Sequence, residues 1–132
     1  MDERMGNLTS DPDLPADRPQ PRRWHTICAI EELEDPGAKG FAIEGEWPLH
    51  GFVVRRGERV YAYVNACPHE GRSLQWKPDA FLTRDRRLIM CSAHGAIFEI
   101  ETGLCVAGPC VGAHLRALPA RIAGGLVDVA AA

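Results

Sequence analysis

The sequence has no excess of positive charge and no long hydrophobic run. Its 15 lysine and arginine residues against 18 aspartate and glutamate residues give a formal net charge of −3, so no broad positive field is available to hold nucleic acid or anionic lipid. No stretch approaches the roughly 20 apolar residues that a membrane-spanning helix needs. The opening residues, MDERMG, lack the charged and then apolar order of a secretory signal. We therefore expect a cytoplasmic protein with neither nucleic acid nor membrane as a partner.

The sequence contains an odd number of cysteines. Five cysteines in the expected cytoplasmic setting argue against a disulfide framework and indicate metal-binding thiolates or buried free thiols. Glycine-rich loops of the flavin- or nicotinamide-binding kind are also absent. The sequence thus gives no motif for an organic redox cofactor.

The chain of 132 residues, 45% of them hydrophobic, has the length and composition of one globular domain. Residues 1–23 hold four of the ten prolines and only scattered apolar side chains, so we predict a flexible N-terminal tail there. The folded domain is expected to span residues 24–132.

Short apolar runs separated by glycine, proline and aspartate predict an all-β fold without a long helix. The expected strands are 24–29, 41–44, 52–55, 60–65, 81–83, 88–91, 96–99, 115–122 and 126–129. Turns are expected at Asp85 and at Gly124-Gly125. One helical turn is expected within 30–37, ended by Pro36 and Gly37.

Two short segments each pair a cysteine with a histidine and end in glycine. They are residues 67–71 (CPHEG) and 91–95 (CSAHG), and each follows a predicted strand. Two similar loops that face each other can present four side chains to one metal centre. The candidate ligands are Cys67, His69, Cys91 and His94.

Thiolates and imidazoles together suit either tetrahedral zinc or an iron–sulfur cluster. Zinc fingers usually place two cysteines in one knuckle and two histidines on a helix, whereas here each loop offers one of each and no helix follows. A Rieske cluster needs two cysteines on one iron and two histidines on the other, which two mixed loops can supply. The glycines allow the backbone to approach and donate N–H groups to sulfide.

From about residue 24 to residue 129 the sequence resembles the Rieske ferredoxin family. The resemblance rests on the two loops, on Gly108-Pro109 as the loop that packs over the cluster, and on strands before and after the ligands. It implies stacked antiparallel sheets with a cluster-binding subdomain, about residues 65–110, inserted between strands. It also implies one 2Fe-2S cluster on the four candidate ligands. The 21 residues between His69 and Cys91 exceed the spacing in many members, and the extra length is interpreted as a hairpin at 81–90.

The resemblance also implies a low reduction potential. High-potential members carry a disulfide between the two loops, at places that resemble Arg72 and Ala93 here. They also carry a serine and a tyrosine that donate hydrogen bonds to sulfur, at places that resemble Ala96 and Phe98 here.

The remaining cysteines and histidines are given structural roles. Cys28 is expected in the core. Cys105 and Cys110 flank the Gly-Pro loop. Free thiols are favoured there, and a disulfide between the two cysteines is the alternative. The histidines expected to be structural are His25, His50 and His114.

The expected function is one-electron transfer rather than catalysis, since no second site is evident. The resemblance implies a flavin-dependent reductase as donor and a ring-hydroxylating terminal oxygenase as acceptor, with the histidine-bound iron taking up the electron. Two alternatives remain: a small subunit of a reductase complex such as nitrite reductase, and a zinc-binding interaction module.

Overall fold

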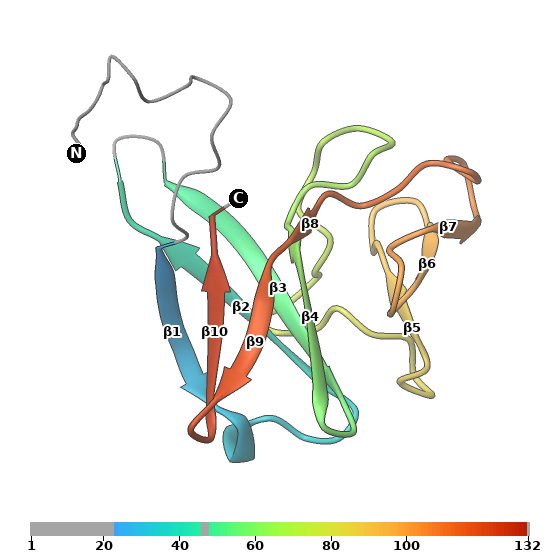
Figure 1. Ribbon diagram of the computed structural model, residues 1–132. Coiled ribbons are helices and arrows are strands. Elements are labelled where there is room, and N and C mark those ends of the chain that lie inside the picture. The colour runs from blue at the N-terminus through green and yellow to red at the C-terminus, as the bar shows by residue number, and fades with distance from the viewer. Residues whose placement is uncertain (1–22, 46–47, 132) are drawn as a thin grey trace, which may run out of the picture.

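The computed structural model describes residues 23–45 and 48–131 and confirms the all-β prediction (Figure 1). The elements are β1 (Trp24–Ala29), η1 (Ile30–Glu32), β2 (Gly37–Ile43), β3 (Leu49–Arg56), β4 (Arg59–Val64), β5 (Leu88–Met90), β6 (Ile97–Glu99), β7 (Cys105–Ala107), β8 (Ala117–Leu118), β9 (Ala120–Ala123) and β10 (Leu126–Ala130). The predicted tail lies outside the described residues except for Arg23. In the described part of the chain, no helix has the length and hydrophobicity to cross a membrane.

Three antiparallel sheets make up the described part of the chain. Their strand orders are β2-β3-β4-β8, β1-β10-β9 and β5-β6-β7. Figure 1 shows the first two sheets side by side in the main body and the third to one side of them. The stacked arrangement that was expected is therefore present.

Consecutive residues in the middle of the central strand β3 are buried. Because successive side chains of a strand point to opposite sides, the strand is covered on both faces. Phe52 and Val54 join a buried cluster that extends into the β5-β6-β7 sheet, where Phe98 is fully buried. Val53 joins a second cluster with Val127 of β10. One strand thus binds the small sheet on one side and the β1-β10-β9 sheet on the other.

The small sheet is an insertion between two paired strands. The chain leaves the main body after β4 and returns at β8, and β8 pairs antiparallel with β4 through Ala62 opposite Leu118 and Tyr63 opposite Ala117. The inserted segment therefore begins and ends at one place in the sheet. This arrangement agrees with the inserted subdomain that the resemblance implied.

Several elements of the structure differ from those expected. The single strand predicted at 115–122 is two strands in two sheets, β8 and β9, separated by Pro119, which has no N–H for a ladder hydrogen bond. The strand predicted at 81–83 is only a bridge between Leu82 and Ile89, and β7 was not predicted. Helical structure ends at Glu32, and β2 begins at Gly37, earlier than expected.

Candidate metal centre

The two cysteine-histidine loops share one scheme of backbone hydrogen bonds. The Cys67 amide donates to the carbonyl five positions later (2.8 Å), and the Gly71 amide donates back to the Cys67 carbonyl (2.6 Å). In the second loop the Cys91 amide and the Gly95 amide make the same two bonds, at 2.9 and 3.0 Å. Gly71 and Gly95 both have φ +73°, a backbone conformation that favours glycine. The repeated motif in the sequence is therefore a repeated structure.

The second loop is held by the continuation of the first. The Ser92 amide and hydroxyl both donate to the Leu74 carbonyl, each at 2.9 Å. The Leu74 amide donates in turn to Oδ1 of Asn65 (2.8 Å), and the Asn65 side-chain amide donates to Oε1 of Gln75 (2.8 Å). These bonds fix the distance between the loops, so the loops form one site.

The two imidazoles meet at the exposed end of this site. Nδ1 of His69 and Nδ1 of His94 are 3.2 Å apart, and the ring planes are 86° from each other. Two nitrogens that bind one tetrahedral ion at about 2.0–2.1 Å are separated by about 3.3 Å. The pair therefore has the spacing of two ligands to one metal ion.

Glu70 adds a carboxylate to the exposed end, which the sequence analysis did not predict. Its Oε1 lies 3.9 Å from Nδ1 of His94 and 3.3 Å from Nε of Arg72. Its position directly after His69 was the available signal. The carboxylate places a negative charge beside the imidazole pair, partly balanced by the arginine.

The two thiols meet at the buried end. Cys67 is 3% exposed and Cys91 is 2% exposed. Burial raises the pKa of the Cys67 thiol, and the neighbouring Cys91 thiol raises it further, while the His69 backbone N–H and the Cys110 side chain lower it. Because a thiol binds metal only after it loses its proton, this buried pair needs a cation to stabilise both negative charges.

The thiols and the imidazoles form two separate pairs. Among the described residues, the one group of three or more metal-donor side chains within 4.8 Å of one another is His69, Glu70 and His94, without either thiol. The four ligands of one tetrahedral zinc ion would all lie within about 4 Å of each other. A buried sulfur pair and an exposed nitrogen pair instead match the two irons of a Rieske cluster. The donor set therefore fits a 2Fe-2S group better than zinc.

A lid formed by residues 105–113 covers the second loop. Gly108 has φ +98°, and a Cβ atom there would lie 2.7 Å from Cα of Ala96, so only glycine permits this approach. Cys105 and Cys110 belong to this lid, and all five cysteines are free thiols in the structure. The Gly-Pro loop thus packs against the second cysteine-histidine loop.

The positions that were compared with high-potential members carry no donor to sulfur. Ala96 and Phe98 are buried, and their side chains have no polar atom.

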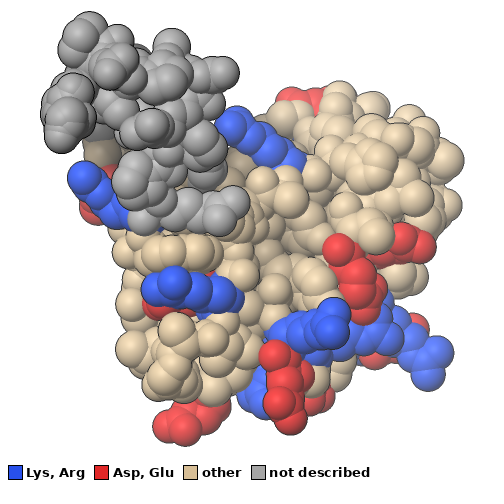
Figure 2. Space-filling model, viewed as in Figure 1, with Lys and Arg blue, Asp and Glu red and all other residues tan. Residues whose placement is uncertain are grey.

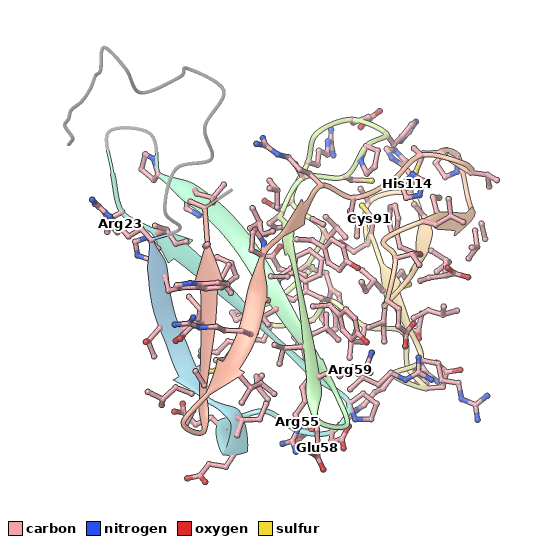
Figure 3. The ribbon with its side chains drawn as sticks, viewed as in Figure 1. Arg23, Arg55, Glu58, Arg59, Cys91 and His114 are labelled. Atoms are coloured by element: carbon pink, nitrogen blue, oxygen red, sulfur yellow. The ribbon has the colours of Figure 1, made fainter. Side chains whose placement is uncertain are left out.

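Cys28 lies in the second buried cluster, as expected. In the described chain, His25, His50 and His114 belong to no group of three metal donors. Figure 3 shows Cys91 and His114 at one end of the molecule, with Arg55, Glu58 and Arg59 at the other.

Charge is unevenly distributed around the site. Figure 2 shows that, on this face, charged side chains gather over the lower part of the molecule, while the surface over β7 is largely uncharged. The lid exposes two large apolar side chains, Val106 at 43% and Val111 at 64%. The surface beside the site therefore offers apolar contact area.

The Rieske [2Fe-2S] domain family matches residues 23–122. Ferredoxin CarAc of Metapseudomonas resinovorans is 30% identical over 87 residues, which cover 66% of this chain and 75% of that protein. The structure is similar to the ferredoxin of carbazole 1,9a-dioxygenase from Nocardioides aromaticivorans IC177, with 27% identity, a TM-score of 0.66, and coverage of 81% of this chain and 96% of that chain. It is also similar to a chain in the complex of reduced oxygenase and oxidized ferredoxin in carbazole 1,9a-dioxygenase, with 27% identity, a TM-score of 0.65, and coverage of 81% and 92%.

Proposed function

Because the chain belongs to the Rieske [2Fe-2S] domain family, we propose that its one 2Fe-2S cluster is held by the buried thiol pair and the exposed imidazole pair. The ligands are Cys67 and Cys91 on one iron and His69 and His94 on the other. The observation that carries this assignment is the 3.2 Å separation of the two Nδ1 atoms, in a group that excludes both thiols. Two metal positions, one for each pair, account for this arrangement.

The protein is a one-electron carrier, since the bound cluster supplies reversible uptake of one electron and no atom transfer. The cysteine and histidine side chains have different roles. The buried cysteines keep water from the sulfur end, and the exposed imidazoles give a partner protein direct access to the other end. We assign no catalytic role to the chain and place it in the cytoplasm.

The acceptor we propose is a ring-hydroxylating terminal oxygenase, and the donor a flavin-dependent reductase. One similar protein is a ferredoxin of carbazole 1,9a-dioxygenase, and another similar chain belongs to a complex of reduced oxygenase and oxidized ferredoxin. The apolar side chains of the lid, Val106 and Val111, lie beside the proposed electron outlet and suit contact with another protein. The 96% coverage of a separate ferredoxin chain supports a free carrier over a subunit of a reductase complex.

Metal analysis of the native protein, purified aerobically, tests the ligand assignment. We expect about two irons and two acid-labile sulfides per chain. His69→Ala and His94→Ala should each remove the cluster or change its spectrum, whereas the matched control His114→Ala should leave both unchanged. Stoichiometric zinc in the native protein would overturn the proposal.

The acceptor is tested separately by mixing the reduced protein with a ring-hydroxylating oxygenase under anaerobic conditions. Reoxidation of the ferredoxin at a rate that depends on oxygenase concentration is expected. No electron transfer to any oxygenase of this class, with an intact cluster, would reject the partner and keep the cofactor.

A further inference from the structure

Glu70 is an additional residue in the first of the two ligand loops. In the second loop the glycine follows the histidine directly, whereas Glu70 stands between His69 and Gly71 in the first. Two hydrogen bonds hold the backbone on both sides of it. The Cys67 amide donates to the Arg72 carbonyl (2.8 Å), and the Gly71 amide donates to the Cys67 carbonyl (2.6 Å). The loop therefore fixes where the Glu70 side chain begins.

The Glu70 side chain extends toward the histidine of the other loop. Its Oε1 lies 3.9 Å from Nδ1 of His94. Among the described residues, Glu70 is the one acidic side chain that forms a group with both imidazoles, in which the donor atoms lie within 4.8 Å of one another. Its negative charge thus lies beside the two side chains that we assign to one iron.

Arg72 offsets this charge only in part. Its Nε lies 3.3 Å from Oε1 of Glu70, but the Arg72 side chain is 68% exposed and the Glu70 side chain 43% exposed. Water and salt weaken the interaction between charges that are this exposed. Because the arginine is the more exposed of the two, it is screened more strongly, and a residual negative charge remains beside the imidazoles.

We propose that the charge of Glu70 lowers the reduction potential of the bound cluster and that Arg72 limits this effect. The inference rests on the proposed function, and neither residue is a ligand. Reduction adds one electron to the cluster, and a fixed negative charge close by opposes this uptake. A lower potential makes the onward transfer of that electron to an acceptor more favourable.

The test is the reduction potential of three variants, measured by spectroscopic redox titration in solution near neutral pH and at low ionic strength. Glu70→Gln keeps the shape of the side chain and removes its charge. It should raise the equilibrium constant for reduction about two- to fivefold, which is about 20–40 mV for one electron. Glu70→Asp keeps the charge and should stay closer to the wild type. Arg72→Gln leaves the carboxylate unbalanced and should lower the potential.

Glu101→Gln is the matched control. The Glu101 side chain is also 43% exposed and also forms an ion pair with an arginine, Arg56. Arg56 ends β3 directly after Arg55, which Figure 3 shows at the end of the molecule opposite Cys91. The control therefore removes one equally exposed negative charge far from the imidazoles, and its potential should stay near that of the wild type.

Salt dependence separates an effect of charge from a change of structure. The Debye length falls from about 30 Å at 0.01 M to about 3 Å at 1 M ionic strength, so the difference between the wild type and Glu70→Gln should become smaller at 1 M. Potentials are compared only for proteins with full iron and sulfide content. If Glu70→Gln does not bind iron, Arg72→Gln decides by the direction of its shift.

Equal potentials for the wild type and Glu70→Gln at low ionic strength would overturn the inference. A Glu70→Gln shift that is unchanged at 1 M, or a potential of Arg72→Gln at or above that of the wild type, would do the same. Absence of a 2Fe-2S cluster from the wild type would instead reject the proposed function.

Discussion

The Tyr63 hydroxyl donates a 2.6 Å hydrogen bond to the Ile100 carbonyl, and this bond joins the central sheet to the inserted segment. Tyr63 lies on β4 and is 2% exposed, and its ring packs against Phe52 at a centroid distance of 5.8 Å. Ile100 follows β6 of the small sheet. The bond therefore connects the main body to the strands behind the second loop.

Tyr63→Phe should lower the free energy of unfolding by about 1–2 kcal/mol, because the buried Ile100 carbonyl loses its donor. Urea denaturation of the loaded protein measures this change. The cluster absorbance and potential should stay unchanged, since the substitution touches neither loop. A decrease in the free energy of unfolding smaller than the error of the measurement would mean that another donor replaces the hydroxyl.

Alkaline pH should weaken the fold through the same tyrosine. Burial raises the pKa of Tyr63 from 10 to about 12, so between these values the unfolded chain releases a proton that the folded protein keeps. The contribution of Tyr63 to the free energy of unfolding is fully present below pH 10, and it decreases by about 2–3 kcal/mol as the pH rises to 12. Denaturation of wild type and Tyr63→Phe across this range isolates the effect, since only the wild type should show this part of the decline. Parallel pH profiles would contradict the assignment.

The reduction potential should lie in the lower part of the Rieske range, below about +50 mV. Ala96 and Phe98 give no hydrogen bond to sulfur, and each restored bond should contribute about 1.5–3 kcal/mol at most, on the order of 60–130 mV for one electron. Ala96→Ser and Phe98→Tyr should each raise the potential, and the double variant should raise it further. Voltammetry near neutral pH is the measurement. A wild-type value above about +150 mV would remove this argument for an oxygenase-type carrier.

Dithiothreitol should leave the cluster intact. The places that resemble the disulfide positions of high-potential members hold Arg72 and Ala93, and Cys105 and Cys110 are free thiols with sulfurs 3.3 Å apart. The visible absorbance of the loaded protein should therefore be constant during thiol treatment. Bleaching of the wild type under mild thiol treatment would show that a disulfide, such as one between Cys105 and Cys110, supports the cluster.

Val111→Lys should slow electron transfer to the oxygenase without a change in potential. Val111 is 64% exposed in the lid, and a lysine there would oppose desolvation of the apolar contact surface. Stopped-flow mixing with the oxygenase should show a rate several-fold lower at equal protein concentrations. Leu126→Lys, an exposed apolar residue on β10, is the control that should keep the wild-type rate. Equal rates for Val111→Lys and wild type would exclude this part of the lid from the docking surface.

The candidate ligands could be predicted from the sequence because the signal is local. A cysteine, a histidine and a glycine within five residues specify each loop, and the structure repeats the same two hydrogen bonds in both. The split at Pro119 and the strand Cys105–Ala107 could not be predicted in this way, because both depend on which distant strand is the partner. The same holds for the contact between the Cys105 and Cys110 sulfurs, which depends on how the lid folds.

The pairing of β4 with β8 gives the inserted segment a single point of attachment. Ala62 and Leu118 stand opposite each other, so the chain enters and leaves the inserted segment at neighbouring positions of the β4-β8 pair. A change of length inside the inserted segment, such as extra residues in the hairpin between the two loops, then leaves the register of both main sheets unaltered. The inserted segment can therefore change in length and sequence while the two main sheets keep their shape.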